Sequence, residues 1–450
     1  MLKKHLIYII LNSCFVLLSI ALPWFGQGYT FLVYVLSLIF LLIQVFNVFD
    51  FKTNYSWFVF GYLILFYISP IFEFFYIGEV LEGSEKSIGL YHLLNISSIH
   101  IFSIFYFISY RVGNKKIILI SKDRFDKVYF LTALVTFFAS IWIFLSVGGF
   151  SAINSTRVDL KYIQGGKIYS LWLLYFSSSF FFLMGIKFLK STKKFYFLIG
   201  MILALSVLEF IYFVALRNRT MILMHLIAIV VGGFVSSRIY FNDISNNINN
   251  DFKKINFMPL LWIMGGLASL GIFIRFARGV YLEGNGNLEI SWKEMLITSV
   301  KSGDFGYANM VIRIIDHVYY TDLMLNGQSY YRLLLAFIPD SIYSKNIITT
   351  DSLIGQMLTG LDVMTIPPGI FGDSYLNFGM LGFVMFIFYG LIFGFLDKNK
   401  NYLLAYMFFS LSFTLIYHFV RGSFVNVVIS LIIIYIGCFF VVKFLRPKYI

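Results

Sequence analysis

The segment Thr365–Gly382 combines residue types that could support chemistry beside a membrane. One carboxylate, Asp373, is followed closely by Tyr375 and Asn377, which we expect to bind substrate. Prolines and glycines bend the backbone here, and Gly372 would let the chain come close to a ligand. Polar, irregular backbone beside an apolar span is tolerated only where protein or a water-filled cavity surrounds it. We therefore expect a site, with Asp373 as a general base; a helix cap is the structural alternative.

Three further side chains are candidates for the same catalytic role. Asp304 follows a glycine in the long polar region before this segment, and His317 could accept a proton because neutral imidazole does so near pH 7. Glu209 lies inside an apolar run, where a carboxylate is costly and indicates a candidate site by default. Ordinary solvated charges, or a hydrogen bond between helices for Glu209, are the alternative interpretations.

Arginines in predicted external turns and loops suggest anion binding. Arg217 and Arg219 share one tight turn between apolar runs, and Arg421 occupies another. A guanidinium fork binds two phosphate oxygens at once, so such a cluster would suit a lipid-linked pyrophosphate. The alternative is that each arginine extends to the interface and pairs with a carboxylate. The arginines proposed to bind substrate are Arg157, Arg217, Arg219, Arg278, Arg332 and Arg421.

The elements that must position these residues are apolar helices. Of 450 residues, 59% are hydrophobic and 13% are charged, and apolar runs recur at lengths that cross a ~30 Å hydrocarbon core. We predict an all-α, polytopic integral membrane protein with roughly twelve transmembrane helices. The predicted spans are His5–Pro23, Phe31–Phe49, Trp57–Tyr76, Tyr91–Tyr110, Val128–Val147, Tyr169–Ile186, Phe195–Leu216, Met221–Val235, Met258–Ile274, Tyr375–Phe395, Tyr402–Phe419 and Phe424–Val442.

Loop charges predict the topology. If the N-terminus is cytoplasmic and the spans alternate, most of the 35 Lys and Arg fall on the cytoplasmic side, including those in the loops Arg111–Lys127 and Lys187–Lys194 and in the tail from Lys443. Both termini are then cytoplasmic, and positive loops rather than nucleic-acid binding explain the net charge of +13. Residues 1–277 hold nine spans, residues 278–374 form one large external loop, and residues 375–450 hold three spans and the tail.

The external loop should contain short amphipathic helices. Apolar residues recur at helical spacing in Trp292–Val300 and Tyr307–Tyr320, which predicts helices lying along the membrane surface. Ser329–Ile338 predicts another short helix, which Pro339 would end. A connection of this length usually carries function.

Several classes of site are absent from the sequence. The two cysteines, Cys14 and Cys438, lie in predicted spans and support neither a disulfide framework nor a metal cluster. The chain has no phosphate-binding loop of the Walker type, no Rossmann glycine pattern, no His-Glu-x-x-His motif and no Asp-x-Asp pair. We therefore predict no cofactor and no metal, and ATP-driven transport within this chain has no support.

Two segments resemble the O-antigen polymerases of Gram-negative bacteria, the Wzy type. Gly327-Gln-Ser-Tyr-Tyr-Arg-Leu-Leu-Leu-Ala-Phe-Ile-Pro-Asp340, followed by Lys345, is similar to the Gly…Tyr…Ile-Pro…Lys segment of that family. Pro367-Pro-Gly-Ile-Phe-Gly-Asp-Ser-Tyr-Leu-Asn-Phe-Gly379 is similar to its Pro…Gly-Glu-x-Tyr-x-Asn-Phe-Gly segment, with Asp373 where Glu is common. The general layout, with about a dozen spans and one large external loop late in the chain, is also similar.

The resemblance implies a function. The substrate would be an undecaprenyl-pyrophosphate-linked oligosaccharide, and the protein a multi-pass enzyme of the bacterial inner membrane. It would be a glycosyltransferase that polymerises O-antigen or related repeat units at the periplasmic face, by transferring the growing chain to a new lipid-linked repeat. Membrane lipids, a chain-length regulator and a flippase would be its partners, and no nucleic acid is expected.

Two alternatives remain open. An O-antigen ligase would transfer the same donor to a lipid A core. A polysaccharide flippase or transporter should show charged groups near the midplane of several spans. Here the charged residues concentrate in one external loop and Glu209 is nearly alone within a span, which favours an enzyme.

Overall fold

The computed structural model describes most of the chain. The described residues are 2–24, 26–48, 53–76, 80–110, 117–146, 148–150, 168–191, 194–216, 220–241, 297, 301, 306–335, 338, 350–360, 366–398, 402–408 and 419–449. The predicted span Met258–Ile274, the helix expected at Trp292–Val300 and part of the span Tyr402–Phe419 lie outside these residues.

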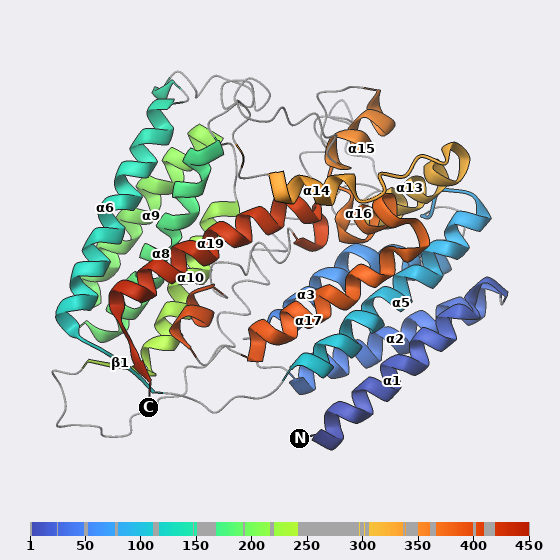
Figure 1. Ribbon diagram of the computed structural model, residues 1–450, viewed down its shortest axis with the longest axis horizontal. Helices are drawn as coiled ribbons and strands as arrows, with labels where there is room; N and C mark the ends of the chain where they lie inside the picture. The colour runs from blue at the N-terminus through green and yellow to red at the C-terminus, as the bar shows by residue number, and fades with distance from the viewer. Residues whose placement is uncertain are drawn as a thin grey trace, which may run out of the picture.

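Helices make up nearly all of the described structure (Figure 1). They are α1 (Leu2–Ile20), α2 (Gln27–Val48), α3 (Asn54–Tyr62), α4 (Ile68–Phe75), α5 (Glu85–Ser109), α6 (Lys122–Ser146), α8 (Ile168–Lys190), α9 (Lys194–Leu216), α10 (Thr220–Ser236), α13 (Tyr307–Thr321), α14 (Gln328–Leu335), α15 (Thr350–Thr359), α16 (Gly369–Phe378), α17 (Val384–Lys398) and α19 (Phe424–Leu445). Short 3-10 turns, η1 (Leu22–Trp24) and η4 (Gly379–Phe383), follow α1 and join α16 to α17.

Six helical stretches among the described residues are long and apolar enough to cross a membrane. They are Gln27–Val45, Asn54–Phe75, Glu85–Ser109, Lys122–Ser146, Gly369–Lys398 and Val427–Leu445. The prediction of a helical, membrane-embedded protein is confirmed at this level. The number of twelve spans stays a prediction.

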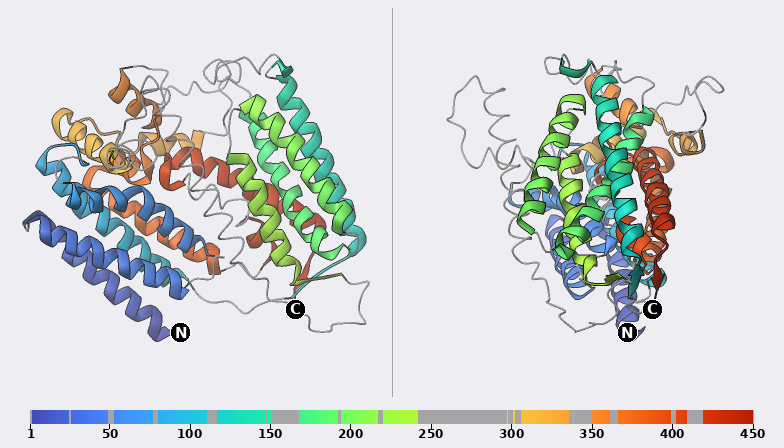
Figure 2. Two further views of the ribbon diagram at one scale, coloured as in Figure 1. Left: turned by 180° about the vertical axis from the view of Figure 1, so that it is seen from behind. Right: turned by 90° about the vertical axis from the view of Figure 1, so that its left-hand side faces the viewer.

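The helices form two groups (Figure 1). One group contains α1, α2, α3, α5 and α17, and the other contains α6, α8, α9 and α10. Helix α19 packs along α8 and α6 and meets α14 where it begins. The helices α13 to α16 gather at one end of the molecule, and both chain termini lie at the opposite end, as the view from behind also shows (Figure 2).

One span is interrupted by a π turn. Residues Leu63–Tyr67 (η2) form this turn between α3 and α4. Pro70 has no N–H group, so it cannot bond to the carbonyl of Phe66, four residues earlier. That carbonyl instead accepts hydrogen bonds from the Tyr91 hydroxyl at 2.7 Å and from Asn95 Nδ2 at 2.8 Å, both on α5. Side chains thus supply hydrogen bonds to a backbone carbonyl that lipid acyl chains could not supply.

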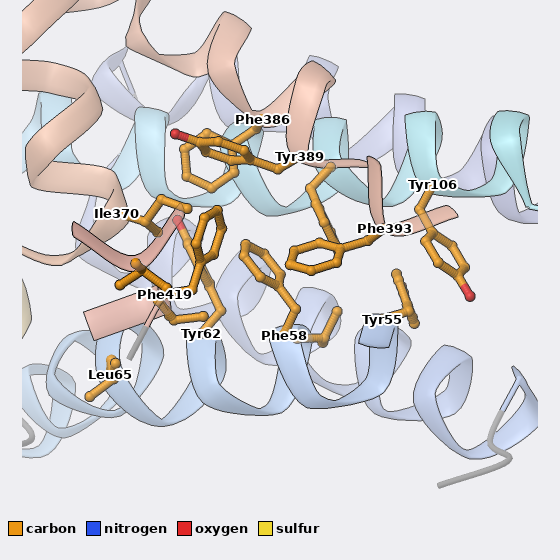
Figure 3. Close-up of a cluster of buried hydrophobic side chains, with 14 of the residues drawn as sticks. Tyr55, Phe58, Tyr62, Leu65, Tyr106, Ile370, Phe386, Tyr389, Phe393 and Phe419 are labelled. Atoms are coloured by element: carbon orange, nitrogen blue, oxygen red, sulfur yellow. The ribbon is translucent and has the colours of Figure 1, made fainter. Parts of the chain in front are cut away.

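Aromatic side chains fill the space between α3, α5 and α17 (Figure 3). The ring centroid of Phe58 lies 4.0 Å from that of Phe102 and 5.4 Å from that of Phe393. Phe419, which comes shortly before α19, lies 5.6 Å from Phe393 and 5.1 Å from Tyr389 between centroids. Offset and edge-to-face packing of this kind fixes α17 firmly, and with it the position of α16 just before it.

A small sheet joins three segments that are distant in the sequence. Its strands are β1 (Ile118–Ile120), β2 (Ile239–Phe241) and β3 (Lys448–Tyr449), in the order β2-β1-β3. Strand β1 pairs in parallel with β2 and antiparallel with β3. The all-α prediction did not include this sheet, since strands of two or three residues leave no periodicity to detect. The charge pattern predicts all three segments on one side of the membrane, and the sheet holds them together at one end.

Candidate functional site

Asp373 lies inside a helix rather than in the loop before it. The predicted span began at Tyr375, but α16 begins at Gly369, directly after Pro368. Gly369 has φ +71°, and a Cβ atom there would come 2.8 Å from Cζ of Phe66, so this tight entry suits glycine. The side chain of Asp373 is fully buried. The expectation of irregular backbone at this carboxylate was therefore wrong, because a Pro-Pro-Gly sequence can also begin a helix.

Gly372 serves helix packing. A Cβ atom at this position would come 2.8 Å from Cδ1 of Ile314 and 3.5 Å from Cγ2 of Val311, both on α13. The glycine thus brings α16 against α13. This differs from the close approach of a ligand that the sequence suggested.

The carboxylate of Asp373 caps a helix from another part of the chain. Its Oδ2 accepts a hydrogen bond of 3.0 Å from the N–H of Phe424, the first residue of α19. Its Oδ1 lies 3.4 Å from Nδ2 of Asn377, and the hydroxyls of Thr350 and Tyr330 also hydrogen-bond to it. A negative charge at the start of α19 is favourable because the helix dipole is positive there. Asp373 therefore caps a helix, although not the one expected, and its role as a general base stays a prediction.

The two segments that resemble the polymerases lie against each other. Oδ1 of Asn377, on α16, accepts a hydrogen bond of 2.8 Å from the hydroxyl of Ser329 on α14. The same amide donates from Nδ2 to the carbonyl of Asp373 at 2.8 Å. Asn377 is fully buried. It therefore holds the Asp373 turn of α16 and the start of α14 in one fixed arrangement.

Tyr330 is the residue that connects most elements of this site. Its ring stacks on Phe424 with centroids 4.8 Å apart, and its hydroxyl lies 3.2 Å from the hydroxyl of Tyr389 and 3.5 Å from Oγ of Ser374. Burial, and then the charge of Asp373, raise the pKa of Tyr330 well above its usual value. The phenol therefore stays protonated and can donate. Sequence reasoning did not single out Tyr330, although it lies within the resembling segment that begins at Gly327.

Arg421 is held beside the same junction. Its Nε donates a hydrogen bond of 2.7 Å to the hydroxyl of Tyr307 at the start of α13, and its guanidinium carbon lies 5.9 Å from that ring. Arg421 precedes Phe424 by three residues, so the cation and the carboxylate of Asp373 flank the start of α19. Tyr375 is almost fully buried on α16, and Arg332 is half-buried on α14.

The other candidates make no described contact with Asp373 or lie outside the described residues. His317 lies on α13, three residues after Ile314, against which Gly372 packs. Glu209 belongs to α9, in the other helix group, and its side chain lies outside what the structure describes. The candidates Arg157, Arg217, Arg219, Arg278 and Asp304 lie outside the described residues.

Ion pairs anchor α13 to the segment that leads into α5. The carboxylate of Glu82 pairs with Arg313 at 2.5 Å and with Lys301 at 2.8 Å. Hydrogen bonds from Lys301 and Arg313 lower the pKa of Glu82. Asp316 accepts a hydrogen bond of 2.7 Å from the hydroxyl of Ser84, the N-cap of α5. These contacts position the helix that carries Tyr307.

A second buried carboxylate, Asp397, lies at the opposite end of α17. Its Oδ1 accepts hydrogen bonds from the N–H of Asn54 at 3.0 Å and from Nδ2 of the same residue at 2.8 Å. Its Oδ2 accepts from the N–H of Tyr55 at 3.3 Å and from the hydroxyl of Tyr106 at 2.9 Å. Asp397 therefore fixes the start of α3 against α17 and α5.

Within the described part of the chain, no three His, Cys, Asp or Glu side chains gather closely enough to hold a metal ion. Comparison with protein-family models, with curated proteins and with solved structures found no match to this chain. The geometry around Asp373, together with the sequence pattern, is what supports a function.

Proposed function

We propose that this protein is a membrane glycosyltransferase that polymerises undecaprenyl-pyrophosphate-linked oligosaccharide repeats at the periplasmic face of the inner membrane. One observation carries the proposal: the two segments with polymerase-like sequence pack together around Asp373, with Arg421 at the same junction. Glycosyl transfer from a pyrophosphate donor needs a base for the acceptor hydroxyl and cations for the leaving group. The junction offers both types of group.

In the proposed step, the carboxylate of Asp373 takes the proton from a hydroxyl of the incoming repeat. The hydroxyl oxygen bonds to the anomeric carbon of the growing chain as the bond from that carbon to the pyrophosphate breaks. The lipid pyrophosphate leaves with the negative charge, which the guanidinium of Arg421 stabilises. Arg157, Arg217, Arg219, Arg278 and Arg332 are proposed to hold the pyrophosphates of donor and acceptor.

Two neighbours would prepare Asp373 for this step. Tyr330 stays protonated and donates to the carboxylate, and Asn377 ties the same helix turn to Ser329. Because Asp373 is fully covered, a sugar hydroxyl reaches it only if the hydroxyl of Thr350 or Tyr330 moves aside. Entry of the acceptor sugar therefore requires a movement on α14, which carries Tyr330, or on α15, which carries Thr350.

The ladder of surface polysaccharide in a deletion strain tests the reaction type. A polymerase mutant should attach a single repeat to each lipid A core, because ligation and export continue. Absence of any repeat would indicate the ligase or flippase alternative instead. An unchanged ladder would contradict all three, and complementation with the intact chain must restore the original ladder.

A further inference from the structure

The small sheet lies where two candidate spans end. Strand β1 ends at Ile120, and α6 begins at Lys122; α19 ends at Leu445, and β3 begins at Lys448. In the antiparallel pairing, Ile118 is opposite Tyr449 and Leu119 is opposite Lys448, so the chain just after α19 lies beside the chain just before α6. Figure 1 shows β1 and the C-terminus together at this end. If α6 and α19 both cross the membrane, the sheet lies at the level of the lipid headgroups.

Exposed cations from both helices meet at this sheet. The first turn of α6 and the last turn of α19 contribute exposed basic side chains, and so does β3. They are Lys122, Arg124, Lys443, Arg446 and Lys448. The nearby acids Asp123 and Asp126 already form ion pairs with Lys127 at 2.8 Å and with Lys187 at 2.9 Å. Among the described residues of this end, the patch therefore keeps a surplus of positive charge.

The backbone fixes the spacing of these cations. Arg446 adopts φ +46° and its N–H bonds to the carbonyl of Val442, so the chain turns sharply out of α19. A non-glycine residue rarely adopts this conformation. The pairing of β3 with β1 then holds Lys448 beside α6. Positive charge in loops is common on the cytoplasmic side, but here a sheet locks cations from two spans into one arrangement.

Exposed apolar side chains accompany the cations. Phe444, between Lys443 and Arg446, is 58% exposed. Phe195 and Tyr196, at the start of α9, are 69% and 75% exposed and follow α8, whose Lys190 lies over the ring of Tyr240 in β2. Rings of this kind suit the boundary between headgroups and acyl chains. A free anion would use only the charges, whereas a lipid would use both the charges and the rings.

We propose that this patch binds the phosphate headgroup of an anionic phospholipid and thereby anchors the C-terminal segment to the leaflet. The ligand class is a phosphodiester lipid such as phosphatidylglycerol or cardiolipin. Basic residues near a membrane surface attract anionic headgroups, each contributing to the affinity. This proposal is independent of the reaction proposed at Asp373.

Lipid titration of the purified full-length protein tests the proposal, with bound lipid counted by native mass spectrometry. The wild type should bind phosphatidylglycerol and cardiolipin more tightly than phosphatidylcholine. The variant Arg446→Gln/Lys448→Gln should lose about 30-fold in affinity for the anionic lipids. The control Lys86→Gln/Lys398→Gln removes the same charge away from the sheet, and its affinity should stay within about twofold of the wild type.

Equal binding of phosphatidylcholine, or an equal loss in the control, would overturn the proposal. Release of the lipid by millimolar inorganic phosphate would assign the patch to free anions instead. Arg446→Lys/Lys448→Arg keeps the charges and must keep the affinity. If the glutamine variant does not fold, Lys122→Gln/Arg124→Gln on α6 removes the same charge from the patch, and unchanged affinity in that variant would contradict the proposal.

Discussion

Two buried aspartates at opposite ends of one helical stretch, Gly369–Lys398, hold the starts of two other helices in different ways. Asp397 accepts four hydrogen bonds, two of them from backbone N–H groups of α3. Asp373 receives one backbone N–H at 3.0 Å, a longer contact with Asn377 at 3.4 Å and hydrogen bonds from two hydroxyls. Hydroxyls rotate easily, whereas backbone donors at a helix start stay in place.

Burial and capping alone therefore do not mark a site. Both carboxylates are buried and both cap a helix. Asp397 is fixed by donors that the fold itself supplies, so its role is structural. Asp373 has exchangeable partners and lies beside Arg421 and the polymerase-like segments, so the proposed chemistry is placed at that end.

The largest expected effect concerns the side of the membrane on which each aspartate lies. Reporter fusions after Lys190 and after Lys448 should report the cytoplasm, and a fusion near Asn326 should report the periplasm. This outcome is all-or-none, because each reporter is active on one side only. A cytoplasmic signal near Asn326 would place Asp373 on the wrong side for a periplasmic reaction.

Asp373→Asn should reduce the polymerisation rate by about 10²–10⁴-fold, because the amide cannot accept a proton. Its oxygen can still accept from the N–H of Phe424, and Asn caps helices as well as Asp, so stability should change by less than about 1 kcal/mol. Polymer length and protein abundance are measured together in the complemented strain. Unchanged polymer output would make Asp373 a cap only, and the base would then be sought at Asp304, His317 or Glu209.

Asp397→Asn should show the opposite pattern. One carboxylate oxygen becomes an NH₂ group, which donates instead of accepting. Either the two donors of Asn54, or the Tyr55 N–H and the Tyr106 hydroxyl, then lose their acceptor. We expect a loss of about 2–3 kcal/mol in the free energy of unfolding, with normal activity per folded molecule. Thermal unfolding in detergent measures the loss, and Tyr106→Phe, which removes one donor, should lose less. A stable but inactive Asp397→Asn protein would contradict a purely structural role for Asp397.

Arg421→Lys should lower the rate by about 10–100-fold at normal abundance, because lysine keeps the charge and loses the bidentate fork. Tyr307→Phe removes the hydrogen bond that Nε of Arg421 donates to the Tyr307 hydroxyl and should have a milder effect. Arg219→Lys is expected to behave like Arg421→Lys. Full ladders in both arginine variants would rule out phosphate binding by a fork.

The smallest expected effect is a pH dependence at Glu82. Its pKa is lowered by Lys301 and Arg313, so the pairs stabilise the protein above the ordinary pKa of Glu and lose this contribution as the pH falls through the lowered value. The shift in melting temperature should be small because these ion pairs are partly exposed. Thermal unfolding from pH 7 to pH 3 should show Glu82→Gln below the wild type at neutral pH and equal to it in acid. A constant difference would contradict this account.

The sequence predicted the helices better than the site. Apolar runs of span length identify most of the helices, and helical spacing identified α13 and α14. The contacts of Asp373 could not be predicted, because Phe424 and Thr350 are distant in the sequence and only tertiary packing brings them together. Asp397, next to Lys398, has the local pattern of a surface charge. Its burial follows from the Tyr106 and Asn54 contacts, which no local pattern contains.

The carbonyl of Phe66, which Pro70 leaves without its usual helical donor, connects the membrane insertion of one helix with that of the next. When the segment Asn54–Phe75 emerges from the ribosome into the translocon, this oxygen lacks the N–H donor that residue 70 would otherwise supply, and exposing an unsatisfied carbonyl to acyl chains costs several kcal/mol. Tyr91 and Asn95 follow after a short connection. The two segments should therefore enter the bilayer as a hairpin, and loss of the Asn95 amide should send nascent chains to membrane proteases before any catalytic defect arises.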